Sequence, residues 1–236
     1  LQRLLDCPRK RVRALIVAPT RELAEQIHDD ISRLAKQTGL RSISIYGGVG
    51  KQPQIRAIRN GVEILVACPG RLLDLLNDRA FSLNGVEALV LDEADHMFDK
   101  GFLPDIRRII KQLPTDRQSL VFSATMPRQI RSIAQKYLKT PEEIIVEPDG
   151  NELSTINQKF WMATGAKKSQ ALIKILEAVS FDGVIVFVKT KNATLEVAKS
   201  LEDRGFKAEA LNGDLAQAAR ERTINRLKNS HIDILV

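Results

Sequence analysis

Short apolar runs alternate with longer amphipathic stretches along the whole chain. The short runs are rich in Val, Ile and Leu and fit strands, whereas the longer stretches repeat apolar residues every three or four positions, as helices do. This alternation predicts βαβ units and parallel sheets, and therefore an α/β fold. In the first part of the chain the predicted strands are 12–18, 42–46, 63–67, 86–91, 119–122 and 143–146, and the predicted helices are 21–36, 72–76, 104–112 and 129–138.

Polar and chain-breaking residues at 147–151 interrupt this pattern. Beyond them the alternation restarts, which predicts a second domain of the same class. Its predicted strands are 157–162, 184–188, 207–211 and one that begins at Ile232, and its predicted helices are 167–178, 193–204 and 217–228. We therefore expect a first domain at 1–147, a linker at 148–156 and a second domain at 157–236. We expect both domains to be cut short at the chain ends, because a natural domain rarely stops inside a buried strand.

Three carboxylates follow one of the apolar runs directly, at Asp92, Glu93 and Asp95. The run before them, 88–91, predicts a strand buried on both faces of a parallel sheet, so the acids fall at its carboxyl end, where open α/β sheets bind ligands. A carboxylate there can hold Mg²⁺ on a nucleotide, and a neighbouring one can activate water. The alternative is an acidic loop that caps the next helix, and this stretch alone does not decide between the two.

Composition describes a globular protein with a basic surface. Of its 236 residues, 44% are hydrophobic and 28% are charged, and no apolar run approaches the length of a membrane span. Cys7 and Cys68 are too few and too far apart for a disulfide framework or a zinc site, which favours a reducing, cytoplasmic location. The net charge of +7 favours a polyanionic partner, although only weakly.

Three predicted strand-to-helix turns share one design. Pro19, Thr20 and Arg21 follow the first strand, and Cys68-Pro69-Gly70-Arg71 follows the strand at 63–67. Thr190 opens the helix after the strand at 184–188. Free N–H groups at such helix starts suit phosphates, and several on one sheet edge suit a phosphate backbone read without regard to base. Taken singly, the threonines are more often N-caps and the arginines solvated surface.

A glycine-rich turn and a hydroxyl-bearing turn complete the candidate chemistry. Gly47 and Gly48 begin the run 47–51, which lacks the spacing of a P-loop but lets a backbone approach a ribose-phosphate closely. Ser123 and Thr125 follow the strand at 119–122, on the same expected edge as the acids, where their hydroxyls would face Asp95 or Glu93. A hydroxyl turn with a helix cap is an equal alternative there.

Together these motifs resemble those of DEAD-box RNA helicases, in order and spacing, over essentially the whole chain. The first half supplies residues 19–24, 47–48, 69–71, 92–95 and 123–125, and the second half supplies 186–190, 212–214 and 217–220. The stretch 190–197 is most similar to the bacterial cold-shock and ribosome-assembly branch. The resemblance implies two RecA-like domains that clamp single-stranded RNA and separate short duplexes at the expense of ATP.

Residue roles follow from the resemblance. Asp92 would hold Mg²⁺ on ATP through water, and Glu93 would activate the hydrolytic water. Asp95 would interact with Ser123 and Thr125 and couple hydrolysis to RNA-dependent closure. The implied RNA contacts are Pro19, Thr20, Arg21, Gly47, Gly48, Gly70 and Arg71 in the first domain, and Thr190, Gly213, Asp214, Gln217 and Arg220 in the second. Ribosomal precursors or the RNA degradation machinery would be the wider partners.

Departures from the family pattern qualify these expectations. Cys68 stands where the family usually has Thr, which would weaken one RNA contact. The P-loop would lie before Leu1 and the arginine-finger motif beyond Val236, so we expect this chain alone to be inactive as an ATPase. Two alternatives remain at this stage, namely an RNA-binding or annealing module that does not use ATP, and a related DNA helicase. Asp95 and the motif at 19–24 argue against the DNA helicase.

Overall fold

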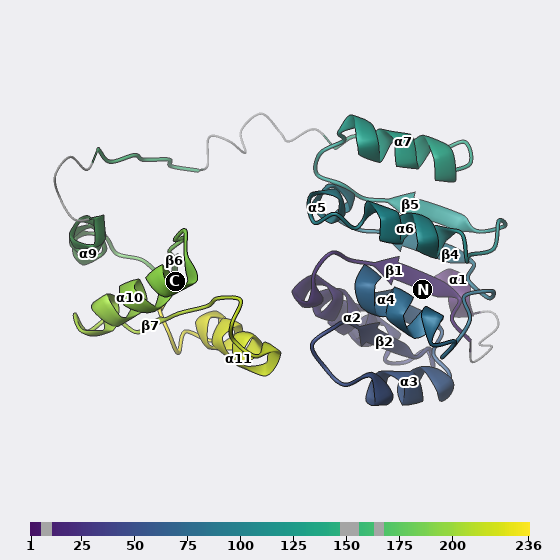
Figure 1. Cartoon of the computed structure of the whole chain (residues 1–236), viewed down its shortest axis with the longest axis horizontal. Helices are drawn as coiled ribbons and strands as arrows, with labels where there is room; N and C mark the ends of the chain where they lie inside the picture. Colours follow the sequence, from purple (N-terminus) through teal and green to yellow (C-terminus); the bar gives the residue numbers. More distant parts are fainter. Residues whose placement is uncertain (6–10, 147–155, 163–167) are drawn as a thin grey trace. The chain divides into compact units, whose positions relative to one another are not determined.

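The chain forms two compact units, Leu1–Glu143 and Ile144–Val236. The computed structural model describes residues 1–5, 11–146, 156–162 and 168–236 (Figure 1). Each unit combines a parallel sheet with helices, so the predicted α/β class is confirmed. The predicted linker lies outside the described residues except for its last position.

The first unit is built on a five-stranded parallel sheet with the order β2-β3-β1-β4-β5. Because all neighbours are parallel, the carboxyl ends of β1, β3, β4 and β5 lie along one edge of the sheet. The strands are β1 Ala14–Val17, β2 Ser42–Ile45, β3 Ile64–Ala67, β4 Ala88–Leu91 and β5 Gln118–Val121. The helices are α1 Gln2–Leu5, α2 Arg21–Ala35, α3 Lys51–Arg59, α4 Pro69–Asn77, α5 Ala94–Asp99, α6 Leu103–Ile110 and α7 Arg128–Tyr137.

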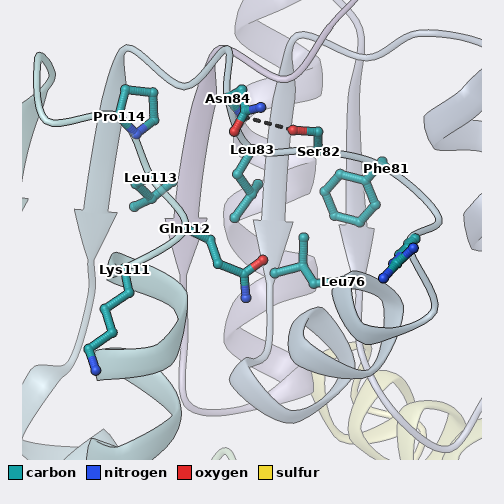
Figure 2. A pocket seen from close by; sticks show the side chains of 10 residues that line it. Leu76, Phe81, Ser82, Leu83, Asn84, Lys111, Gln112, Leu113 and Pro114 are labelled. Carbon is teal, nitrogen blue, oxygen red and sulfur yellow. Dashed lines mark hydrogen bonds between the residues drawn. The ribbon is translucent and has the colours of Figure 1, made fainter.

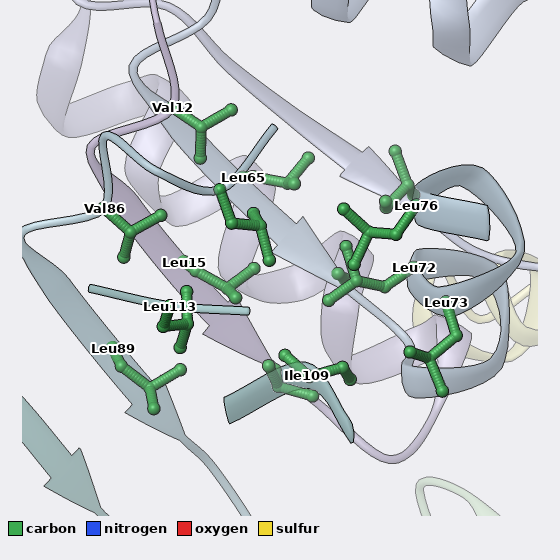
Figure 3. Close-up of a cluster of buried hydrophobic side chains, with 14 of the residues drawn as sticks. Val12, Leu15, Leu65, Leu72, Leu73, Leu76, Val86, Leu89, Ile109 and Leu113 are labelled. Atoms are coloured by element: carbon green, nitrogen blue, oxygen red, sulfur yellow. The ribbon is translucent and has the colours of Figure 1, made fainter. Parts of the chain in front are cut away.

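The core of this unit lies mainly on one face of the sheet (Figure 3). Leu15 and Leu89 point from β1 and β4 toward Leu72 of α4 and Ile109 of α6, and all four side chains are buried. Ile16 of β1 faces the other way and belongs to a second cluster, which α2 covers. This alternation of strand side chains between two helical layers fixes the register of the sheet and therefore the position of its carboxyl edge.

Strand β4 departs from its prediction as a strand buried on both faces. Leu89 and Leu91 are buried, whereas Ala88 and Val90 are half-buried. The buried pair packs under the helices of the main core, while α2 packs mainly over β2 and β3 on the other face. The neighbouring β1 and β3 are buried along their whole length, as their apolar runs predict.

The second unit contains a three-stranded parallel sheet with the order β6-β8-β7. Its core joins Ile173, Leu201 and Ile234, which come from two helices and the central strand. The strands are β6 Val184–Ile185, β7 Ala208–Glu209 and β8 Ile234–Leu235, and the helices are α9 Lys168–Ala178, α10 Lys191–Glu202 and α11 Gln217–Lys228. The three strands are shorter than their predicted ranges but lie within them.

Several predicted elements are wrong. Residues 143–146 and 157–162 form no strand, and Ile145 and Phe160 are 73% and 90% exposed. Both segments have strand-like composition, but no described strand pairs with either, and a strand is stable only as part of a sheet. Helices α3 and α5 were not expected. Pro53 gives the sequence of α3 the look of a loop, yet it sits in the first turn, where proline is tolerated.

No helix among the described residues has both the length and the apolar character that a membrane span requires.

Candidate functional site

The acids at 92–95 occupy the carboxyl edge of the first sheet, where β4 ends. The N–H of Asp92 still donates to the carbonyl of Val17 in β1, at 3.0 Å, so its backbone is fixed by the sheet. One carboxylate oxygen of Asp92 accepts the N–H of Glu93, also at 3.0 Å. Burial raises the pKa of Asp92, although this N–H partly opposes the shift. A cation beside Asp92 would compensate for that burial, which fits a role near Mg²⁺.

Glu93 makes a sharp turn between strand and helix. Its φ of 48° and ψ of 54° are left-handed, a conformation that costs a non-glycine residue about 1–2 kcal/mol. Asp95 lies in the first turn of α5, and the side chain of Glu93, at the N-cap, makes no capping hydrogen bond. Instead, one carboxylate oxygen lies 3.1 Å from Nδ1 of His96. Backbone strain of this kind gathers at functional sites, and the carboxylate of Glu93 is half-exposed there.

Asp95 is tied to the turn that follows β5. Its Oδ2 accepts both the hydroxyl and the N–H of Thr125, each at 2.8 Å, and its own N–H donates to Ser123 Oγ at 3.1 Å. Ser123 in turn donates to the Thr125 carbonyl at 2.7 Å. Burial opposes ionisation of Asp95, but the hydrogen bonds from Thr125, Ser123 and the His96 N–H outweigh it and lower the pKa. The expected pairing of these hydroxyls with an acid is confirmed, and the acid is Asp95 and not Glu93.

Arg21 and the glycine turn lie against one another beside the first helix start. Thr20 caps α2, its Oγ1 accepting the Leu23 N–H at 3.2 Å, so its N-cap interpretation is confirmed. Gly48 has φ +86°, and a Cβ there would come within 2.4 Å of a terminal nitrogen of Arg21. A side chain at position 48 would displace the end of Arg21, and the positive φ also favours glycine there. Two motifs far apart in sequence thus form one surface at the sheet edge.

The side chain of Arg71 is largely buried and holds the same glycine turn. Its side chain is only 9% exposed, so the interpretation as solvated surface is wrong. The guanidinium donates to the Val49 carbonyl at 2.9 Å and to Oε1 of Gln54 at 3.2 Å, and it lies 3.7 Å from Asp74. Gln54 also donates to the Tyr46 carbonyl at 3.1 Å. Arg71 and Gln54 therefore brace both ends of the turn.

The start of α4 is open. Cys68 occupies its N-cap without a side-chain capping bond, and a Cβ on Gly70 would meet nothing within 4 Å. Burial raises the pKa of the Cys68 thiol to about 11, so it is neutral near pH 7. The first N–H groups of this helix are consequently available to an outside acceptor at the same edge as Arg21 and the acids.

In the second unit, the predicted residues gather around the start of α10. Thr190 caps that helix, accepting the Ala193 N–H at 3.2 Å. Asp214 forms an ion pair with Lys191, and its N–H donates to the side chain of Asn212 at 3.1 Å. Gly213 lies beside Lys191 in this turn, where its Cβ would be 3.6 Å from that side chain.

Helix α11 contacts the turn at 212–214 through Arg220. Arg220 donates to the Asn212 carbonyl at 3.4 Å, and Gln217 is buried and donates to Glu221 at 2.9 Å. Sequence reasoning missed Gln54, His96 and Lys191. His96 and Lys191 directly follow Asp95 and Thr190, and Gln54 lies three residues beyond the glycine-rich run 47–51; these positions alone hinted at them.

Within the described residues, no group of three or more His, Cys, Asp or Glu side chains could hold a metal ion by itself. The edge offers Asp92 as a single half-buried carboxylate. That donor set fits Mg²⁺ carried by nucleotide phosphates, because such sites use one or two carboxylates and complete the shell with water and phosphate.

Comparison with protein families decides the assignment. The family model described as DEAD/DEAH box helicase matches residues 1–133, more than half of the chain. The chain belongs to this family. A second family model, the helicase conserved C-terminal domain, matches residues 167–236. Both units therefore have the RecA-like fold of DEAD-box proteins.

Relatives and solved structures agree with this assignment. The ATP-dependent RNA helicase DeaD of Escherichia coli (strain K12) is 44% identical over 233 residues, which cover 98% of this chain and 37% of that protein. DeaD of Buchnera aphidicola (strain Sg) is 45% identical over 96% of this chain and 38% of its own length. This DEAD-box chain thus spans just over a third of the length of these relatives.

Among solved structures, a DEAD box protein from Methanococcus jannaschii matches with a TM-score of 0.57 and 38% identity, over 98% of this chain and 63% of that one. A yeast Dbp5 variant bound to Gle1 and IP6 matches with a TM-score of 0.68 and 26% identity, over 96% and 56%.

Proposed function

We propose that this chain is part of an ATP-dependent RNA helicase, which clamps single-stranded RNA and separates short duplexes as it hydrolyses ATP. The observation that carries the proposal is the bridge from Asp95 to Ser123 and Thr125, next to Asp92 and Glu93 on one sheet edge. A hydrolytic site that must respond to RNA needs its acids connected to neighbouring elements, and these hydrogen bonds supply such a connection.

The acids divide the work according to their surroundings. Asp92 is fixed by the sheet and would hold Mg²⁺ through water, while bound Mg²⁺ would neutralise charge on the ATP phosphates. Glu93 is half-exposed, so it would orient and deprotonate the attacking water. The hydrogen bonds of Asp95 lower its pKa and keep it charged. Asp95 would couple the turn at 123–125 to ATP hydrolysis.

RNA would lie along the helix starts of each unit. In the first unit, Arg21, Gly48 and the open start of α4 at Gly70 present donors and bare backbone at one edge. Arg71 would act by holding the glycine turn. In the second unit, the RNA would be contacted by Thr190, Gly213 and Asp214. The supporting residues are Pro19, Thr20 and Gly47 in the first unit, and Gln217 and Arg220 in the second.

The relatives named DeaD support a bacterial type of helicase. We place its work in the cytoplasm, on ribosomal precursors or with the RNA degradation machinery.

The test is RNA-stimulated ATP hydrolysis by two proteins. One is this chain, and the other is a chimera that adds at each end the flanking sequence of the E. coli relative. We expect the chimera to hydrolyse ATP and to do so faster with RNA. If the chimera binds RNA but hydrolyses no ATP, the proposal fails and an RNA-binding module without ATPase activity replaces it.

A further inference from the structure

A hollow at the amino-terminal edge of the first sheet lies opposite the edge that carries the acids (Figure 2). It has a volume of about 940 Å³ and is bounded by the end of α4, the loop at 81–84 before β4 and the turn at 111–114 before β5. A second hollow of about 490 Å³ shares Lys111 and Leu113 with it and continues past β5 to the end of α7. We call the two together the basal groove.

The floor of the basal groove is apolar. Leu76, Leu83 and Leu113 line it and are buried, and Phe81 is half-buried against the same core. Figure 2 shows these side chains gathered between the three bounding segments, with Gln112 among them. Tyr137, which lines the second hollow, is half-buried as well.

The rim of the groove is basic. Five cationic residues line it, whereas Glu142 is the one acidic residue in the lining, and none of these cations forms an ion pair with a described residue. They are Arg79, Lys111, Arg117, Lys136 and Lys139. Lys51 differs from them, because its ammonium is held by Asp74 and Asp78. The groove therefore presents uncompensated positive charge.

Both arginines of the rim carry a local energetic cost. Nε of Arg117 is buried and has no hydrogen-bond partner among the described residues, and an unmade bond of this kind is unfavourable. Arg79 has φ 51°, and its N–H closes the end of α4 on the Leu76 carbonyl at 3.0 Å. Glycine fills such a position without steric cost, so an arginine there places a cation at the groove against local preference.

We propose that the basal groove binds an extended acidic segment of a partner protein, whose apolar side chains cover the floor while its carboxylates meet the rim. Charge complementarity and the apolar floor carry this assignment. The groove lies at the edge opposite the acids, so the proposal does not depend on the ATPase assignment.

The test uses a fluorescein-labelled synthetic peptide that alternates Glu with Leu, and measures its binding to this chain by fluorescence anisotropy. Arg79→Gly and Lys111→Gln should each weaken binding about two- to fivefold, the range for a partly exposed ion pair, and together about tenfold. Added salt should weaken binding to the wild type. Lys36→Gln, which removes an exposed cation at the end of α2, is the matched control and should change nothing.

Arg79→Gly also separates binding from folding. It removes the cation and relieves the left-handed backbone at once, so its Tm should equal or exceed that of the wild type while its affinity falls. A peptide with Ser in place of Leu should bind more weakly because it leaves the floor uncovered. The proposal is overturned if the wild type does not bind the acidic peptide, or if the double variant binds it unchanged. It is also overturned if single-stranded RNA, and not the peptide, loses affinity in these variants.

Discussion

Thr125 donates two hydrogen bonds to the same oxygen of Asp95, one from its hydroxyl and one from its N–H, and both measure 2.8 Å. Asp95 belongs to the helix after β4, and Thr125 to the turn after β5. The two ends of neighbouring strands are thereby locked together on the side where ligands of such sheets bind. This lock accounts for the lowered pKa of Asp95 and leads to a prediction about stability.

Asp95→Asn should lower the stability of the first unit at neutral pH. Loss of the charge-assisted bonds should cost about 1–2 kcal/mol, which corresponds to a drop in Tm of a few degrees. The stabilisation is present above the ordinary pKa of 3.8 and is lost as pH falls through the lowered pKa of the folded state. Thermal unfolding from pH 3 to pH 7 should therefore show the two proteins converging at the acid end. A difference in Tm that stays constant from pH 3 to pH 7 would contradict a lowered pKa of Asp95.

Asp92→Asn should raise the stability of the first unit at neutral pH, whereas Asp95→Asn lowers it. Burial raises the pKa of Asp92, so the folded state holds that proton to higher pH than the unfolded chain, and ionised Asp92 lowers stability above the raised pKa. The substitution should raise Tm at pH 7 by about 1–3 °C, with the gain vanishing below the ordinary pKa of 3.8. A lower Tm at pH 7 would show that Asp92 stabilises the unliganded fold.

Arg71 and Arg21 should differ in how their loss affects RNA binding. Arg71→Ala removes the brace of the glycine turn and leaves the Val49 carbonyl without its donor, so the first unit should lose about 1–3 kcal/mol of stability. RNA affinity should fall while the salt dependence of binding stays unchanged, because no phosphate contact is lost directly. Arg71→Lys should not rescue it, since one ammonium cannot replace the fork that reaches Val49 and Gln54.

Arg21→Ala is the matched comparison. Arg21 is half-buried at the sheet edge beside Gly48, and as a phosphate contact its loss should weaken binding about equally for all sequences and lower the salt slope by about 1. Filter binding of two unrelated RNAs at several salt concentrations measures both quantities. Equal salt slopes for the two variants would contradict the proposal that Arg21 contacts phosphate while Arg71 only braces the glycine turn.

Gly48→Ala tests the contact between the two motifs. The new Cβ would lie 2.4 Å from Arg21, on a backbone with φ +86°, so Arg21 must move and the turn is strained. RNA binding should weaken with a lower salt slope, as in Arg21→Ala. Gly70→Ala is the control for folding, because its Cβ meets nothing within 4 Å and should leave Tm unchanged or slightly higher. Unaltered RNA binding by Gly48→Ala would argue against a role for this turn.

The sequence predicted the parts of the site that depend on local order. Acids directly after an apolar run, and threonines at the first position before a helix, are placed by the strand and helix that flank them. Asp92, Thr20 and Thr190 accordingly lie where they were expected. The residues alone left the hydroxyl pairing open between Glu93 and Asp95, and only the family resemblance named Asp95. The two acids are two residues apart, and the left-handed backbone of Glu93 separates them.

Features that depend on distant partners were beyond the sequence. The position of the Arg71 side chain depends on Val49 and Gln54. Gln54 lies on α3, a helix that was not predicted because its sequence contains Pro53. The segments at 143–146 and 157–162 fit strands by composition, yet pairing depends on a neighbouring strand that local pattern cannot supply.

The most direct measurement is the rate of RNA-stimulated ATP hydrolysis by the chimera with Glu93→Gln. We expect kcat to fall about 100-fold or more, while ATP and RNA still bind, because the amide keeps the size of Glu93 but cannot take a proton. Asp99→Asn, which neutralises another exposed acid on the same helix, should keep full activity. Turnover by Glu93→Gln at the rate of the unsubstituted chimera would contradict the account.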